Sequence, residues 1–354
     1  MEQTAKHHTR AGHVRRRAPH VMVAGLASVA LAVTGCGGGA AGGSSDDGSM
    51  TFVSTLPMES LTFTPELVAE SLGYFKDVGL DVKFESAQGS SPAIQSVITD
   101  TALLTRTSDI DSMQNIATAD APIVNVSSSQ KSATLRLVSS TKAPIEKPED
   151  LEGKKIGVPS AKGSSDTTVD LMAAAGGVST KSVKKQVVGL SPANFQLVKK
   201  GRIAGLVVSA DTAVAIQGAE PSAILLDPTS VVPASQSYVA AKPALADAGN
   251  KEKIKKYLKA VAKAMQFVID DREKGFDKTL KLIGEARDVP ILKTPELAKK
   301  SLELYVDTWV EDGEANLLKV DEKRWDSLYQ KMVDVGVAKP GKDPGEWITN
   351  ELVP

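Results

Sequence analysis

Hydrophobic and polar positions along this chain follow two alternating patterns. From residue 51 onward, short apolar runs of strand type alternate with segments whose apolar residues recur at helical spacing. This alternation predicts mostly parallel sheets covered by helices, an α/β fold. The expected strands are 50–55, 79–84, 102–105, 123–126, 134–139, 154–158, 183–188, 204–208, 223–226 and 237–241, and the expected helices between them are 65–72, 91–98, 108–118, 165–175, 192–199 and 212–217.

After residue 251 the pattern is mainly that of amphipathic helices. Ile254, Leu258, Val261, Met265 and Val268 lie at helical spacing, which is typical of a face packed on a core. We therefore expect two α/β lobes, with a second lobe inserted in the first and the C-terminal helices packed on the first lobe. The expected boundaries are 51–141 plus 239–354 for lobe 1 and 142–238 for lobe 2.

The N-terminal region has a different character. Basic residues up to Arg17 precede an apolar run, 21–33, and a single cysteine follows at Cys36. A charged segment, a short apolar run and small residues before a cut are typical of a secretory signal, and the run is too short to span a bilayer of roughly 30 Å. We expect residues 1–35 to be removed and the Gly- and Ser-rich residues 36–50 to form a flexible tether.

Removal of residues 1–35 limits the chemistry that remains. All four histidines of the chain lie there, and Cys36 is its only cysteine. Triads with His and metal sites built on imidazole are thereby excluded, and no cofactor is expected. Five cations and Glu2 are also lost, which leaves 37 Lys and Arg against 42 Asp and Glu, a net charge of −5. This charge, with 4% aromatic residues, argues against nucleic acid as a partner.

Polar residues gather after the expected strands, where ligands of open α/β sheets bind. In a two-lobed protein these strand ends face each other across a cleft that closes on its solute. The candidate solute-binding residues fall into two groups along the chain. Those up to residue 128 are Thr55, Met58, Ser60, Gly89, Ser90, Arg106, Thr107 and Ser128, and those from residue 160 onward are Ser160, Gly163, Ser164, Ser165, Asp166, Ser209, Asp211 and Tyr238.

Several of these residues have a structural alternative. Arg106 ends an apolar strand, so its guanidinium either holds a carboxylate or sulfonate or pairs internally with Asp109 or Asp111. Ser90 either lines the cleft or caps a helix. Tyr238 either stacks on a flat ligand or packs in the core.

The charges of the candidate site predict no single sign for the solute. Residues 160–166 join a strand to a helix, where free backbone N–H groups and the helix dipole favour an anion. Asp166 and Asp211 favour a cation instead, although Asp211 could equally serve as a helix N-cap. A zwitterion such as taurine would satisfy both sets, and we keep it as a hypothesis.

Four motifs resemble one family of proteins. GYFKDVGLDV at 73–82, PEDLEGKKIGVP at 148–159, GRIAGLVV at 201–208 and the segment 324–352 are similar to stretches of the SsuA/Thi5/NMT1-like solute-binding proteins. Residues 33–36, VTGC, resemble the bacterial lipobox, in which the cysteine is lipidated. The chain departs from the family pattern at Gly205, where Asp is usual, and at 102–111.

This resemblance implies a two-lobed periplasmic-binding-protein type II fold and a role in an ABC importer. We expect a monomeric receptor, tethered by lipidated Cys36 to the outer face of a membrane, that delivers a sulfonate, nitrate or thiamine-pyrimidine precursor to a permease with a cytoplasmic ATPase. A sensor or scaffold lipoprotein without a transporter is one alternative. An enzyme like the fungal pyrimidine synthases is the other, although their active-site histidine is lacking after leader removal.

Overall fold

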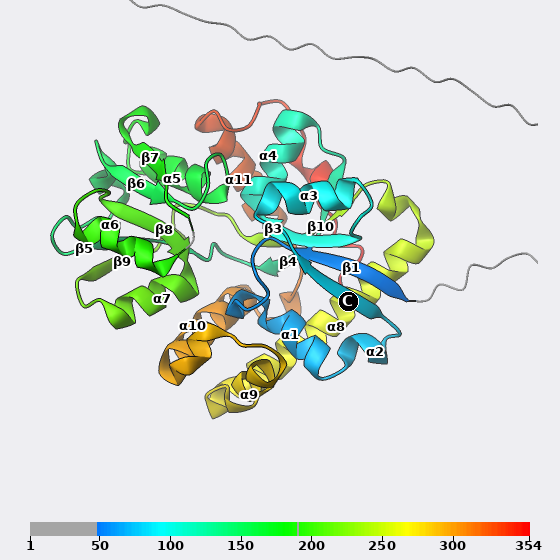
Figure 1. Ribbon diagram of the computed structural model, residues 1–354. Helices are drawn as coiled ribbons and strands as arrows, with labels where there is room; N and C mark the ends of the chain where they lie inside the picture. The colour runs from blue at the N-terminus through cyan, green and yellow to red at the C-terminus, as the bar shows by residue number, and fades with distance from the viewer. Residues whose placement is uncertain (1–47, 190) are drawn as a thin grey trace, which may run out of the picture. The chain divides into compact units, whose positions relative to one another are not determined.

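We analysed a computed structural model that describes residues 48–189 and 191–354. The expected leader, Cys36 and residues 36–47 of the expected tether lie outside the described residues. In the described part, the strands form two sheets of five strands, each with helices packed over it (Figure 1). This arrangement confirms the α/β class. No helix of the described residues is both long enough and apolar enough to cross a membrane.

The first sheet has the strand order β2-β1-β3-β10-β4. It consists of β1 (Ser49–Ser54), β2 (Asp81–Ser86), β3 (Leu104–Ser108), β4 (Ile123–Gln130) and β10 (Gln236–Ala241). The strands β1, β2 and β3 run parallel, and β10 runs antiparallel to β3 and β4. Ser49 and Met50 thus belong to a strand, not to the tether expected over 36–50.

Helices cover both faces of this first sheet. They are α1 (Thr64–Ser71), α3 (Ser90–Ile98), α4 (Asp109–Ala119), α8 (Ala248–Asp271) and α11 (Glu322–Asp334). Successive side chains of a strand point to opposite faces. Phe52 of β1 accordingly packs in a cluster with α1 and α8, and Val53 packs in a cluster with α3, α4 and α11. Because both faces are covered, the ends of the strands are the part of the sheet left to contact a ligand.

The motif at 73–82 forms a short helix and the turn into β2. The helix is α2 (Tyr74–Asp77), which the hydrophobic pattern did not predict. Gly73 and Gly79 lie on either side of it, each with φ of +73°, a conformation that glycine adopts without the steric cost of a Cβ. Between them, Phe75 is buried and stacks on Tyr257 of α8. The motif therefore places one aromatic ring in the core between two tight turns.

The second sheet has the order β7-β6-β8-β5-β9. Its strands are β5 (Leu135–Ser140), β6 (Lys155–Val158), β7 (Lys184–Val187), β8 (Gly205–Ser209) and β9 (Ala223–Leu226), and its helices are α5 (Ser164–Ala175), α6 (Phe195–Lys199) and α7 (Ala210–Ala219). The central strand β8 explains one departure from the family pattern. A Cβ on Gly205 would lie 2.9 Å from Leu137 Cδ2, so an aspartate here would require the Leu137 side chain of β5 to shift.

The path of the chain between the sheets differs from expectation at one strand. The chain builds β1–β4 in the first sheet, β5–β9 in the second and then returns as β10 to the first. Strand β5 was expected in lobe 1, within 51–141, yet it hydrogen-bonds to β8 and β9. We therefore place the two crossovers at residues 131–134 and 232–235, and we use "first lobe" and "second lobe" for the parts built on the two sheets.

The C-terminal helices mostly pack on the first lobe, as expected. Helix α8 contacts α1 and α2, and α11 contacts α4, while α9 (Asp277–Ala286) lies against α1. Helix α10 (Pro295–Val310) also contacts α7 of the second lobe. There, Lys300 Nζ donates to Gln217 Oε1 at 3.3 Å. In Figure 1, α10 is the orange helix below α7.

Candidate functional site

A cavity of about 570 Å³ lies where strand ends of both sheets meet. We call it the interlobe cleft. Thr55 follows β1 in the first lobe, whereas Ser160 follows β6 and Ser209 ends β8 in the second. The starts of α3 and α5 also face the cavity. The interlobe cleft is lined mainly by residues 55–57, 87–92, 133–135, 159–165 and 234–236, together with Ser108, Asp111 and Ser209.

Half of the predicted binding residues line this cleft. All of them lie just after a strand or at the start of a helix, which is why the strand-end argument found them. They are Thr55, Gly89, Ser90, Ser160, Gly163, Ser164, Ser165 and Ser209. Their hydroxyls and the backbone N–H groups of the helix starts give the cleft many short hydrogen-bonding groups.

One acidic residue of the cleft, Asp111, contacts both lobes. It lies in the first turn of α4 and is 5% exposed. Its Oδ2 accepts a hydrogen bond from Ser90 Oγ at 2.5 Å. Burial raises the pKa of Asp111, and the polar groups of Ser90 and of Ser164, at the start of α5, oppose that rise. Asp111 was expected only as a pairing partner for Arg106, although it follows β3 and so lies where strand-end residues bind a ligand.

The remaining lining of the cleft is close to neutral. Among the described lining residues, the ionisable groups are Asp111 and Lys162, and the latter is exposed. Gln88 and Gln236 add amide groups to the lining. Gln88 lies in the stretch after the second expected strand, whereas nothing in the sequence pattern marked Gln236. No aromatic ring lines the described part of the cleft. The site therefore offers hydroxyls, amides and backbone groups, with a single buried carboxylate.

The predicted role of Arg106 as a ligand fork is not what the structure shows. Arg106 is 2% exposed in the first lobe, and its Nη1 lies 3.1 Å from Oε1 of Glu66. Its Nη2 donates to Thr62 O at 2.7 Å, and the guanidinium lies 4.3 Å from the centre of the Phe63 ring. Burial, the largest single cause, opposes the charge of Arg106, but the attraction of Glu66 together with that of the neighbouring tyrosines outweighs it, and the pKa is raised. The alternative partners, Asp109 and Asp111, were also wrong.

Tyr238 completes this buried network and does not stack on a ligand. Its hydroxyl donates to Glu66 Oε1 at 2.7 Å, and its ring lies edge-on to Phe52 and Tyr257. Burial and the nearby charge of Glu66 raise the pKa of Tyr238 well above its ordinary value. The core-packing alternative is thus confirmed. Glu66 itself was missed, because nothing local in the sequence marks a glutamate in α1 as the partner of a residue forty positions away.

The two other predicted acidic residues form contacts outside the cleft lining. Asp166 pairs with Lys185 at 3.2 Å on the far side of the first turn of α5. Asp211 accepts a hydrogen bond from Ser60 Oγ at 3.1 Å, which joins the two lobes. It also accepts the backbone N–H of Thr212, from within α7 and not as its N-cap. The predicted combination of Arg106 with Asp166 and Asp211 around one zwitterion does not form.

Three further predicted residues are buried away from the cleft. Met58 is 3% exposed in the core cluster under α1 and α8, and Thr107 is 2% exposed on β3. Ser128 donates to Gln130 O at 2.9 Å on β4. Strands β3 and β4 continue further than expected, so Thr107 and Ser128 lie within a strand and not after it.

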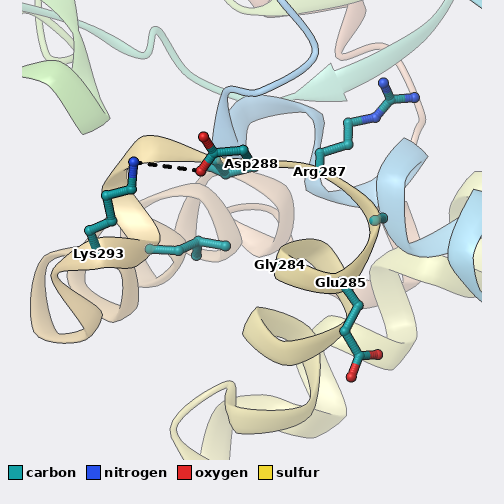
Figure 2. Close-up of a pocket in the computed structure, with 8 residues that line it drawn as sticks. Gly284, Glu285, Arg287, Asp288 and Lys293 are labelled. Atoms are coloured by element: carbon teal, nitrogen blue, oxygen red, sulfur yellow. Dashed lines mark ion pairs between the residues drawn. The ribbon is translucent and has the colours of Figure 1, made fainter.

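A second hollow, of about 410 Å³, is lined by the end of α9 and by residues of the segment that follows it, 287–293. In Figure 2, Asp288 and Lys293 form an ion pair, 3.7 Å long, and Glu285 points away from them. Arg287 bonds to Glu70 at 3.0 Å. Because these charges already have protein partners and no strand ends here, this hollow is a weaker candidate than the interlobe cleft.

Among residues 48–189 and 191–354, no group of three or more His, Cys, Asp or Glu residues is placed to hold a metal ion. Nucleophile–histidine pairs are also impossible there, since the histidines of the chain all lie before residue 48.

Comparison with known proteins decides the family. The model of the NMT1/THI5-like family matches residues 60–274, which is more than half of the chain. The chain belongs to this family. The match covers four strands of the first sheet, namely β2, β3, β4 and β10, together with all strands of the second.

Individual proteins and solved structures that resemble this chain have low sequence identity to it. Riboflavin-binding protein RibY of Chloroflexus aurantiacus is 23% identical over 298 residues, which are 83% of this chain and 83% of RibY. The alkanesulfonate-binding protein SsuA of Xanthomonas axonopodis pv. citri, bound to MOPS, has a TM-score of 0.65 and 14% identity over 85% of this chain and 98% of that one. The nitrate-binding protein NrtA of Synechocystis PCC 6803 has a TM-score of 0.63 and 13% identity over 87% of both. These structures establish the shared fold.

Replacing Arg106 with methionine tests the buried network. The change Arg106→Met leaves Glu66 buried without its cation, and we expect a loss of about 3–5 kcal/mol in the free energy of unfolding. The measurement is urea unfolding followed by circular dichroism. In the control Arg287→Met, the lost pair with Glu70 is partly exposed, so we expect a loss below about 1 kcal/mol. Equal losses in the two variants would contradict the buried-pair interpretation.

Asp109 provides a test by pH. It is buried, and its carboxylate accepts hydrogen bonds from the hydroxyls of Ser235 and Ser237 on the return to β10. Burial raises its pKa above the unfolded value of 3.8, so the folded state holds this proton more tightly and loses stability as pH rises through the raised pKa. Asp109→Asn removes this loss. We therefore expect the unfolding free energy of Asp109→Asn minus that of the parent chain to increase as pH rises from about 4 to 8.

The control for this pH test is Asp120→Asn, on the surface. A hydrogen bond and the charge of Lys342 lower the pKa of Asp120, so its contribution is lost as pH falls. The unfolding free energy of Asp120→Asn minus that of the parent chain should therefore decrease as pH rises, opposite to the change for Asp109→Asn. Parallel pH profiles for the two variants would show that burial does not control the titration of Asp109.

Proposed function

We propose that this chain is the solute-binding component of an ABC importer and that the interlobe cleft holds a small polar organic solute. The observation that carries the proposal is the cleft itself, placed at strand ends of two sheets and lined by hydroxyls and helix starts. Membership of the NMT1/THI5-like family supports it. So do the relatives named for binding riboflavin, an alkanesulfonate and nitrate.

The arrangement is suited to binding and release without chemical change. The cleft has short donors and acceptors from both lobes, so a solute between them bonds to both and favours the closed arrangement. The crossovers at 131–134 and 232–235 are the two chain connections on the cleft side that would act as hinges. The closed, loaded protein would then dock on a permease, whose cytoplasmic ATPase drives release. This role needs no cofactor and no catalytic residue.

We also propose that the protein acts outside the cytoplasm, held to the membrane by lipid on Cys36. The support for this is the basic and apolar leader before VTGC and the Gly- and Ser-rich residues that follow it. In this view the body works as a monomer on the outer face of the membrane, within reach of its permease.

Binding is tested with the full chain and a panel of taurine, ethanesulfonate, nitrate, riboflavin and a hydroxymethylpyrimidine. We expect at least one of them to raise the melting temperature and to bind in calorimetry. A solute at a hundred times its Kd stabilises the protein by about 2.7 kcal/mol. Ala161→Trp places a large ring in the cleft and should abolish this binding, because Ala161 is an exposed part of the lining.

The matched control is Ala119→Trp, at the exposed end of α4 and outside the cleft lining. It should bind the solute like the parent chain. Cells that lack the protein should also lose uptake of the bound solute at low concentration. The proposal fails if no member of the panel, nor any extract of small polar metabolites, stabilises the parent chain.

The anchor is tested by Cys36→Ala in a bacterial host. The parent chain should sediment with membranes and the variant should appear in the soluble fraction, because the acylated thiol is lost. Ser44→Ala, a change in the same tether, should leave the parent distribution intact. A Cys36→Ala protein that still sediments with membranes would disprove lipid anchoring through this residue.

A further inference from the structure

Asp111 reaches from the first lobe to the start of a helix of the second. It follows β3 in the first turn of α4, yet its carboxylate lies near Ser164, whose hydroxyl and backbone favour the charged form of the carboxyl. A Cβ built on Gly163 would lie 4.0 Å from Asp111 Oδ1, which shows how closely α5 approaches. On the first-lobe side, Ser90 Oγ donates to Oδ2 at 2.5 Å. One buried carboxylate thus joins α3, α4 and α5.

These contacts use the donors that an anionic solute would need. The start of α5, a helix of twelve residues, carries the positive end of the helix dipole and free backbone N–H groups. For this reason residues 160–166 were expected to receive an anion. In the structure, the carboxylate of Asp111 already lies beside this helix start, with Oδ1 4.0 Å from the position of a Cβ on Gly163, the N-cap of α5. A second anion placed there would be repelled by the carboxylate.

Among residues 48–189 and 191–354, no cation is among the main groups that stabilise this buried charge. The groups that stabilise the charged form of Asp111 are the hydroxyls of Ser90, Thr107 and Ser164 and the backbone of Ser164. Lys162 is the only cation among the described residues of the cleft lining, and it is exposed. A solute that donates N–H or O–H bonds, or carries positive charge, would therefore complete the site, since a buried carboxylate is stabilised by donors and cations.

We propose that Asp111 sets the charge class of the solute: it occupies the anion-binding end of α5, so that the cleft accepts a neutral or cationic polar solute and rejects an oxyanion. This inference rests on the proposed function and deepens it. It also distinguishes this chain from relatives named for alkanesulfonate and nitrate, with which it shares the fold at 14% and 13% identity.

The test removes the charge and keeps the shape. In the full chain, Asp111→Asn should bind ethanesulfonate at least about tenfold more tightly than the parent chain, measured by calorimetry and by the rise in melting temperature at constant ionic strength. The parent chain should show no measurable binding at about 10 mM ethanesulfonate. Asp170→Asn is the matched control. It also removes one negative charge, here from α5. Asp170 forms an ion pair of 2.7 Å with Lys185 and does not line the cleft, so ethanesulfonate binding should not change.

Each outcome decides the inference. Submillimolar binding of ethanesulfonate by the parent chain would overturn it, as would a folded Asp111→Asn protein with no gain in affinity. If circular dichroism shows that Asp111→Asn is unfolded, Asp111→Ser replaces it with the same expected gain in affinity. The measurement of ethanesulfonate binding by the parent chain does not depend on either variant. Failure of the proposed function is a separate result, namely a parent chain that binds no solute of any charge. A parent chain that binds a sulfonate would overturn only the role of Asp111.

Discussion

Coverage of both faces of two sheets is the constraint on which this structure depends. Each sheet has side chains pointing to both sides, and both sides are apolar: Phe52 faces α1 and α8 while Val53 faces α3 and α4. Once helices bury these faces, only strand ends and the loops after them can contact a solute. The chain crosses between the sheets at 131–134 and 232–235, and the strand ends of the two lobes meet there around one cavity.

Different groups stabilise the buried charges in the core and in the cleft. In the first lobe, Arg106 and Glu66 are both almost fully buried, and they satisfy each other with help from Thr62 and Tyr238. In the cleft, Asp111 has the hydroxyl of Ser90 as a donor, and in the part of the chain that the structure describes no cation is among the main groups that stabilise its charge. The first arrangement is complete without a ligand, as a structural pair is. The second leaves a negative site at the surface of a cavity, where a solute can contribute.

The family relationship and the low identities are consistent with one another. Structures with 13–14% identity share the fold over 85–87% of this chain. Apolar periodicity and turn glycines, such as Gly73 and Gly79 around Phe75, are sufficient to keep such a fold, because they determine packing and not the solute. The residues after the strands line the interlobe cleft instead, and Asp111 is one of them. A shared fold therefore leaves the charge of the solute to individual side chains.

The sequence by itself determined the elements and the edge at which the site lies. Each expected strand overlaps an observed one, because alternation along the chain is a local property. Eight of the sixteen predicted binding residues line the cleft, since polar residues after strands mark the carboxyl end of a sheet. Only the tertiary structure decided the partners. Arg106 pairs with Glu66 and β5 joins the second sheet, because neither contact is local in sequence. Asp111 meets Ser164 only when two lobes are brought together, and no periodicity along the chain encodes the distance between them.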